Sequence, residues 1–168
     1  LNIQLNERIR VATSGQGIVY EENGKGNVKE EYNKLVTPVG GEYFLVLSDG
    51  TKVFLNADSE LEYPVEFTGE KRVVDLKGEA YFEVKKDSLH PFIVRINGAE
   101  VTVLGTSFNV NTYGDDGHVY TTLVNGVVQV SSKKNGQEEV LKPGMQSVMD
   151  VQTGQLTVRE VDVNAYVA

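Results

Sequence analysis

Short runs of alternating apolar and polar residues, separated by turn residues, fill most of the chain. Four Asn-Gly or Asp-Gly pairs lie between such runs: Asp49-Gly50, Asn97-Gly98, Asn125-Gly126 and Asn135-Gly136. These dipeptides suit the two positive φ values of a type I′ turn, so each pair predicts a tight β-hairpin. No stretch of about 11 residues or more has the 3.6-residue period of an amphipathic helix. The pattern therefore predicts an all-β fold.

The alternation is clearest around Asn97-Gly98. A two-residue loop there places Arg95 opposite Glu100 and Val94 opposite Val101. One face of this hairpin is then wholly apolar and predicted to be core: Phe92, Val94, Ile96, Ala99, Val101 and Val103. Each large side chain on that face contributes roughly 1.5–3 kcal/mol when it is buried.

The hairpin around Asp49-Gly50 differs because both of its sides are apolar. With a two-residue loop, one side carries Phe44, Val46, Val53 and Leu55, and the other carries Tyr43, Leu45, Leu47 and Phe54. Two apolar faces favour a strand pair buried between layers, with an exposed partner surface as the alternative.

Further strands are predicted along the rest of the chain. In residues 72–84, one side carries Val74, Leu76, Gly78, Ala80, Phe82 and Val84, and the other carries Glu79, Tyr81 and Glu83. Other strands are expected at 119–124, 127–132, 139–141, 146–151 and 156–161. Residues 6–34 predict an N-terminal hairpin and a mobile loop at 23–27. The expected architecture is an elongated stack of antiparallel hairpins, either a twisted β-sandwich or a β-solenoid-like stack.

Composition limits the partners. The chain has 168 residues, enough for one domain with a sizeable core, and a formal net charge of −8. Such an acidic surface argues against nucleic acid and against anionic lipid as ligands. There is no cysteine, which excludes disulfides and thiolate chemistry. Because the chain starts at Leu1 and has no membrane-length apolar run, we expect a fragment that does not itself insert into a membrane.

No constellation of catalytic or metal-binding residues is visible. Glu79 and Glu83 share a strand face but lie roughly 13 Å apart at strand rise, too far for paired-carboxylate hydrolysis. His90 and His118 lie in separate turns without ligand spacing, and the turn at residues 115–117 lacks the pattern of a calcium loop. We predict no cofactor, no metal and no enzyme activity on substrates.

One peptide bond offers a sharper alternative. The Thr106 hydroxyl directly follows the Gly105 carbonyl, so a strained turn could allow an N-to-O acyl shift and hydrolysis of the resulting ester. On residues alone, Gly105-Thr106 is more simply a bend between two strands.

An ordered series of motifs carries a family resemblance. In chain order these are Thr37-Pro38, Gly40-Gly41, Asp49-Gly50-Thr51, Leu55-Asn56-Ala57, Ser59, Tyr63-Pro64, Gly78-Glu79-Ala80-Tyr81-Phe82-Glu83-Val84, Pro91-Phe92, Val103-Leu104-Gly105-Thr106-Ser107-Phe108-Asn109-Val110 and Pro143-Gly144. Together they resemble the periplasmic domain of FecR-type anti-sigma regulators, in the style of the Bacteroidetes. The resemblance implies a division into an N-terminal extension at 1–36, a FecR-like β domain at 37–161 and a linker at 162–168.

The resemblance also implies a function. FecR-type proteins hold an extracytoplasmic-function sigma factor through a cytoplasmic segment and cross the inner membrane once. They contact the signalling domain of a TonB-dependent outer-membrane transporter mainly through a C-terminal domain. The cytoplasmic, membrane and C-terminal parts are not recognisable in this chain, so we expect a periplasmic relay module with protein partners. Some relatives are thought to cleave themselves at a Gly-Thr bond, which Gly105-Thr106 matches.

A glycan-binding β-sandwich of the cell envelope is the alternative function. Its stacking platform would use surface aromatic residues such as Tyr63, Tyr81, Tyr113 or Tyr120. The absence of tryptophan argues against it, because sugar platforms use that residue heavily.

Overall fold

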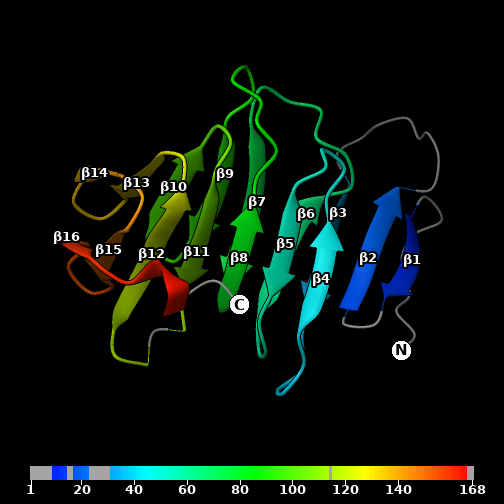
Figure 1. Cartoon of the computed structure of the whole chain (residues 1–168), viewed down its shortest axis with the longest axis horizontal. Coiled ribbons are helices and arrows are strands. Elements are labelled where there is room, and N and C mark those ends of the chain that lie inside the picture. Colours follow the sequence, from blue (N-terminus) through cyan, green and yellow to red (C-terminus); the bar gives the residue numbers. More distant parts are fainter. Residues whose placement is uncertain (1–8, 15–16, 23–30, 114, 166–168) are drawn as a thin grey trace.

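The computed structural model describes residues 9–14, 17–22, 31–113 and 115–165. Two seven-stranded sheets pack face to face, and a two-stranded N-terminal hairpin lies beside them (Figure 1). The hairpin consists of β1 (Ile9–Ser14) and β2 (Gly17–Glu22), which are antiparallel, and β2 lies against β4. The all-β prediction and the N-terminal hairpin are therefore confirmed, whereas the predicted loop at 23–27 lies outside the described residues.

Sheet I has the strand order β14-β13-β10-β9-β7-β6-β3. Its strands are β3 (Tyr32–Val36), β6 (Glu60–Pro64), β7 (Arg72–Lys77), β9 (Phe92–Ile96), β10 (Ala99–Val103), β13 (Val128–Ser132) and β14 (Glu138–Leu141). All neighbours in sheet I are antiparallel except β7 and β9, which are parallel.

Sheet II has the order β16-β15-β12-β11-β8-β5-β4 and is antiparallel throughout. Its strands are β4 (Tyr43–Val46), β5 (Lys52–Leu55), β8 (Glu79–Glu83), β11 (Ser107–Asn111), β12 (His118–Asn125), β15 (Met145–Asp150) and β16 (Leu156–Glu160). A short 3-10 helix, η1 (Val163–Ala165), follows β16 and contacts β12. In the described part of the chain no helix has the length and apolar character needed to cross a bilayer.

The chain passes back and forth between the two sheets. After β3 in sheet I it makes the β4–β5 hairpin in sheet II, returns for β6 and β7, and crosses again for β8. The β9–β10 and β13–β14 hairpins of sheet I likewise alternate with the β11–β12 and β15–β16 hairpins of sheet II. Each crossing places a turn at one end of the sandwich, so the ends collect residues that are distant in sequence.

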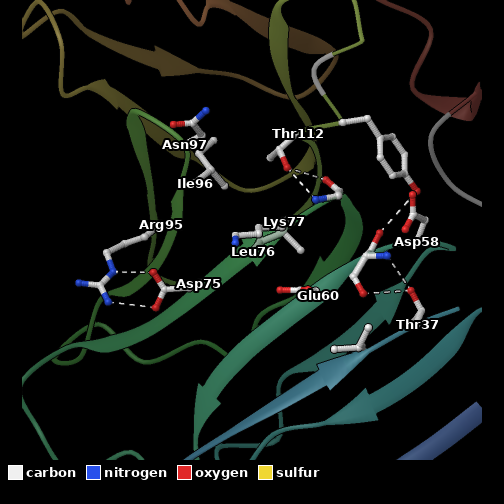
Figure 2. A pocket seen from close by; sticks show the side chains of 14 residues that line it. Thr37, Asp58, Glu60, Asp75, Leu76, Lys77, Arg95, Ile96, Asn97 and Thr112 are labelled. Carbon is white, nitrogen blue, oxygen red and sulfur yellow. Dashed lines mark hydrogen bonds and ion pairs between the residues drawn. The ribbon is translucent and has the colours of Figure 1, made fainter.

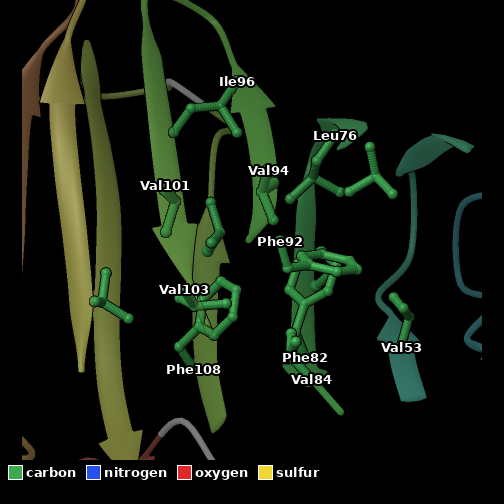
Figure 3. Packing of buried hydrophobic residues seen from close by; sticks show 14 of the residues in the cluster. Val53, Leu76, Phe82, Val84, Phe92, Val94, Ile96, Val101, Val103 and Phe108 are labelled. Carbon is green, nitrogen blue, oxygen red and sulfur yellow. The ribbon is translucent and has the colours of Figure 1, made fainter. Parts of the chain in front are cut away.

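The core lies between the sheets. Phe82 and Phe108 from sheet II stack with ring centroids 5.1 Å apart, and Phe92 from sheet I meets Phe82 edge-on at 6.2 Å (Figure 3). The predicted inner residues Val74, Leu76, Ala80, Phe82 and Val84 are all buried. Residues 72–84, however, are two strands in different sheets rather than one, because the chain crosses over at Gly78.

The crossing at Gly78 needs glycine. Its φ is +99°, and a Cβ atom there would lie 2.2 Å from Ser59 Oγ. Gly126 plays the same part between β12 and β13, with a φ of +101° and the Gly105 carbonyl oxygen 3.0 Å from a would-be Cβ. The predicted hairpin at Asn125-Gly126 is therefore wrong. This turn carries the chain from sheet II to sheet I, since the two flanking strands pair with different partners.

The Asn97-Gly98 hairpin has the predicted register. Arg95 pairs with Glu100 and Val94 with Val101, and all six predicted core residues of the hairpin are buried. Only Gly98 has a positive φ, so the predicted type I′ turn is wrong although the two-residue loop is right. Asn135-Gly136 also joins a hairpin, but through a longer loop in which the Gly136 N–H binds the Ser132 carbonyl.

The Asp49-Gly50 hairpin has a three-residue loop, not two. The Leu47 N–H donates to the Thr51 carbonyl at 2.9 Å, and Phe44 pairs with Phe54. A shift of one residue moves every side chain to the other face. Leu45 and Val53 therefore point into the core, while Phe44 and Phe54 point outward. The predicted burial of both faces is wrong, because Phe54 remains 42% exposed.

Candidate functional site

Arg72 is the most heavily bonded side chain at one end of the sandwich. It begins β7, is 3% exposed, and lies over the Phe92 ring at 5.4 Å. Its Nη1 donates to Asp49 Oδ2 at 2.8 Å and to the Lys85 carbonyl at 2.7 Å. Its Nε donates to the His90 carbonyl at 2.7 Å, and its Nη2 donates to the carbonyls of Asp87 and Leu104.

These bonds join three segments that are far apart in sequence: the β4–β5 turn, residues 84–91 between β8 and β9, and the β10–β11 connection. Asp49 also accepts bonds from the N–H and hydroxyl of Thr51, and the Thr51 hydroxyl accepts the Lys85 N–H. We call this end the Arg72 end. Because the planar guanidinium presents its donors in a fixed geometry, it sets the relative positions of the three segments.

The Gly105-Thr106 bond lies at this end. Thr106 is buried, its hydroxyl donates to the Val127 carbonyl at 3.1 Å, and its carbonyl accepts the Val84 N–H at 2.9 Å. Among the residues that the structure describes, no carboxylate or imidazole hydrogen-bonds this hydroxyl. The arrangement fixes the turn, and the Thr106 hydroxyl has its hydrogen-bond partner in a main-chain carbonyl.

A hollow of about 390 Å³ opens over the same turn. Its lining includes three lysines, Lys52, Lys85 and Lys86, and one acidic residue, Glu83. The other lining residues are Gly50, Val84, Gly105, Thr106, Ser107 and Asn125. At the edge of this region, His90 Nδ1 and Asp87 Oδ2 are 2.7 Å apart, and the bond from His90 lowers the pKa of the Asp87 carboxyl.

We call the opposite end of the sandwich the Glu79 end. There, neutral side chains form hydrogen bonds around one carboxylate and connect neighbouring strands and turns. Glu79 Oε1 accepts a bond from Asn56 Nδ2 at 3.0 Å, and Glu79 Oε2 accepts one from Asn109 Nδ2 at 2.8 Å. The Ser59 hydroxyl accepts the Glu79 N–H. Glu79 therefore links β5, β8 and β11 near one end of these strands of sheet II.

Hydroxyls complete this network. The Thr37 hydroxyl donates to the Asn56 carbonyl at 2.6 Å and accepts the Ser59 N–H at 2.8 Å. The Thr112 hydroxyl accepts the Gly78 N–H at 2.7 Å, and the Tyr113 hydroxyl donates to the Ala57 carbonyl at 2.5 Å. The motif residues at this end thus hold the crossings between the two sheets.

A groove of about 600 Å³ lies beside the Glu79 end (Figure 2). Asp75 and Arg95 on its wall form a two-bond ion pair, 2.9 Å at each contact, and these bonds raise the pKa of Arg95. Thr112 and Thr37 lie on its other side, already bonded to the main chain. Three acidic and two basic side chains line this groove, and nothing in it marks one kind of ligand.

The structure does not bring the other candidate residues together. Glu79 and Glu83 lie at the two ends of β8. His90 and His118 each contact a neighbouring aspartate in its own turn. No group of three or more metal-binding side chains lies together in the described ranges.

The four tyrosines of the glycan alternative do not form one platform. Tyr63 is buried in the core on β6 of sheet I. Tyr81 and Tyr120 face outward on separate strands of sheet II, and Tyr113 lies in the β11–β12 connection. The aromatic row that does exist, Phe44–Phe54–Tyr81, has ring centroids 4.9 and 6.0 Å apart and follows from the corrected β4–β5 register.

Sequence reasoning missed Arg72. The available signal was an arginine at the start of a largely apolar strand. It lies next to the Pro91-Phe92 motif in the folded chain but not in the sequence. Its partners are mostly main-chain carbonyls, which every residue has, so the residue types could not have predicted these bonds.

Comparison with known proteins gives a consistent answer. The FecR protein family matches residues 33–129. A crystal structure of a protein from Parabacteroides distasonis ATCC 8503, proposed to be an anti-sigma factor, has 34% identity and a TM-score of 0.75 over 81% of this chain. A second crystal structure with the same description has 35% identity and a TM-score of 0.74 over 80% of the chain. The chain spans 64% of the length of each, and no curated protein matches it. The chain belongs to the FecR family.

Proposed function

We propose that this chain is the periplasmic part of a transmembrane anti-sigma regulator. In this role it relays a signal from a TonB-dependent outer-membrane transporter to an extracytoplasmic-function sigma factor. Membership of the FecR family, together with the similarity to proteins proposed to be anti-sigma factors, is the observation that supports this proposal. The tether to the inner membrane, the sigma factor and the transporter are parts of the proposal that belong to the longer protein.

The structural roles of the motif residues agree with a domain that contacts other proteins. Asp49, Thr51, Glu79 and Asn109 are engaged in holding strands and turns together. In the proposed role the sandwich transmits position between its two ends. Its open sheet edges, β3 at one side and β14 and β16 at the other, offer strand addition as a mode of protein contact, whereas β2 lies against β4.

The test uses the full-length protein in its own bacterium, with a reporter driven by the cognate sigma factor. Removal of residues 37–161, with the flanking parts joined in frame, is expected to leave reporter output unresponsive to the transporter's ligand. The double substitution Lys133→Glu/Lys134→Glu, which changes charge on an exposed turn, is the control and should leave induction intact. Normal induction without residues 37–161 would contradict the proposal. Alkaline phosphatase fused after residue 168 tests the location, because it is active only in the periplasm.

Self-cleavage at Gly105-Thr106 is a second, separate proposal. The Thr106 oxygen would attack the Gly105 carbonyl carbon, the ester would replace the amide, and the Thr106 nitrogen would become a free amine. Water would then hydrolyse the ester and leave a Gly105 carboxylate and a new N-terminus at Thr106. Gly126 packs closely on this bond, because a Cβ atom there would lie 2.8 Å from Thr106 Oγ1 and 3.0 Å from the Gly105 carbonyl oxygen. This packing favours a constrained turn.

Mass spectrometry of the purified chain tests this proposal. Fragments of residues 1–105 and 106–168 are expected from the unmodified chain and from Thr106→Ser, which keeps the hydroxyl. Thr106→Val should remain intact. If the chain stays whole in every variant, the self-cleavage proposal is wrong, and the proposed relay role is unaffected.

A further inference from the structure

The hollow over Gly105-Thr106 differs in charge from the rest of the molecule. The chain as a whole carries a net charge of −8, yet three exposed lysines against one glutamate line this hollow. In the described residues, Lys52, Lys85 and Lys86 take part in no ion pair, although Lys52 lies opposite Glu83 in the β5–β8 register. Lys34 and Lys133, by contrast, are each within 4 Å of a glutamate. The three ammonium groups are therefore available to an anion.

Main-chain donors accompany these lysines. The N–H groups of Lys86, Gly105 and Thr106, all in residues that line the hollow, have no acceptor among the residues that the structure describes. Gly105 packs so closely on residue 86 that a Cβ atom would lie 2.6 Å from Lys86 Cα. Arg72 fixes both walls, because it bonds the carbonyls of Lys85 and Leu104. The donors are therefore held in place before any ligand arrives.

Apolar side chains flank the donors. Leu104, directly before Gly105, is 45% exposed, and Val127, whose carbonyl binds the Thr106 hydroxyl, is 61% exposed. The combination of fixed N–H groups, ammonium groups and neighbouring apolar side chains is how proteins capture a carboxylate on a peptide.

We propose that this hollow binds a carboxylate of a protein partner, either at a polypeptide C-terminus or on an acidic side chain, with an apolar residue of the partner against Leu104 and Val127. Nucleic acid and anionic lipid are disfavoured by the net negative charge of the chain as a whole. The inference does not depend on the relay role proposed above, and its test needs only the isolated chain.

Three synthetic peptides serve as probes, each N-acetylated. The first is Gly-Ser-Ala-Leu with a free C-terminal carboxylate, the second is its C-terminal amide, and the third is Gly-Glu-Ala-Leu-Gly amide. Binding is measured with the Thr106→Val variant, which keeps the Gly105-Thr106 bond whole and retains all three main-chain N–H groups. It is followed through the backbone amide resonances of Lys86, Gly105 and residue 106 at about 20 mM salt and again at about 200 mM. A free carboxylate should bind at least about tenfold more tightly than the amide twin, and high salt should weaken that binding.

The first and third peptides separate the two sources of the carboxylate. Tighter binding of the first assigns a C-terminus, and tighter binding of the third assigns an acidic side chain. Each outcome supports the proposal. Equal binding of all three peptides would overturn it, as would an equal response to free acetate, because the hollow would then select no carboxylate-bearing peptide.

A matched pair of charge reversals checks the residues. Lys85→Glu/Lys86→Glu should reduce binding by at least about tenfold. Lys133→Glu/Lys134→Glu makes the same change in net charge on an exposed turn at the opposite end of the sandwich and should leave binding within about twofold. Both pairs are exposed, so circular dichroism should show the native fold in each. An equal loss in the two variants would mean that only long-range charge matters and would overturn the assigned site.

Discussion

At the Arg72 end a single buried cation donates to five acceptors, whereas at the Glu79 end a carboxylate, two amides and several hydroxyls share the same task. Both ends hold turns and crossings that connect distant parts of the chain. The first depends on one side chain, so its failure should be abrupt. The second spreads its bonds over separate residues, so losses there should be partial.

The two ends also differ in what they leave free. At the Glu79 end the nearby charges of Asp75 and Arg95 neutralise each other. At the Arg72 end the buried cation is matched by Asp49, and in the described part of the chain the lysines around the hollow have no such partner. An end built around a saturated arginine can therefore still present positive charge to a ligand.

The largest effect is expected from Arg72→Ala. Removal of the guanidinium takes the cationic partner from the largely buried Asp49 carboxylate, which keeps only its bonds from Thr51, and takes a donor from four carbonyls. The free energy of unfolding should therefore fall by about 3–5 kcal/mol. Arg72→Lys should recover only a minor part, because one ammonium cannot reach acceptors in three segments. Denaturant unfolding measures both variants. A loss below about 1 kcal/mol for Arg72→Ala would remove the contrast between the two ends.

Gly78→Ala tests the crossing at the Glu79 end. The positive φ should cost about 1–3 kcal/mol, and the overlap of the new Cβ with Ser59 should add a similar amount. Gly136→Ala is the matched control, because Gly136 has a φ of +75° and no atom within 4 Å of a would-be Cβ. Thermal or denaturant unfolding that ranks the two variants equally would show that the contact with Ser59 carries no cost.

Glu79→Ala should destabilise by about 1–3 kcal/mol, since Asn56 and Asn109 each lose an acceptor. Glu79→Gln should lose about half as much, because one amide oxygen can still accept a bond. The ratio of the two losses, measured by urea unfolding, reports whether the network divides into independent bonds. An all-or-none response would make this end resemble the Arg72 end.

A smaller effect is expected at the ion pair of Arg95 and Asp75 beside the groove. The two side chains are 53% and 39% exposed, so a double-mutant cycle with alanine should give a coupling of about 0.2–1 kcal/mol. The coupling should shrink as salt is raised. A value as large as the loss in Arg72→Ala would show that exposure does not separate these two arginines.

The smallest effect concerns pH. His90 lowers the pKa of Asp87 below 3.8 in the folded chain, so the ionised carboxyl favours the folded state. That contribution is present above the unfolded pKa and is lost as the pH falls through the folded pKa, which lies below 3.8. His90→Ala should raise the Asp87 pKa towards 3.8, as a carboxyl-detected NMR titration would record. An unchanged titration would mean that another group sets this pKa.

Local pattern predicted some of these features and not others. The Asn97-Gly98 hairpin had its register and inner face predicted because two adjacent strands and a short loop contain all the information. Asn125-Gly126 has the same residue types, but its flanking strands belong to different sheets. A turn dipeptide predicts that the chain bends. Whether the bend joins two paired strands in a hairpin or carries the chain to the other sheet depends on which strands the two flanking strands pair with.

The sequence by itself determined the all-β class, the family and most of the inward-facing residues, because alternation, turn residues and ordered motifs are properties of neighbours in the chain. Tertiary structure decided the exchange between two sheets, the outward position of Phe44 and Phe54, and the Arg72 end. These depend on contacts between main-chain groups and segments distant in sequence. Every residue type has a main-chain carbonyl oxygen that can accept a hydrogen bond, so the amino-acid sequence does not indicate which carbonyls do so.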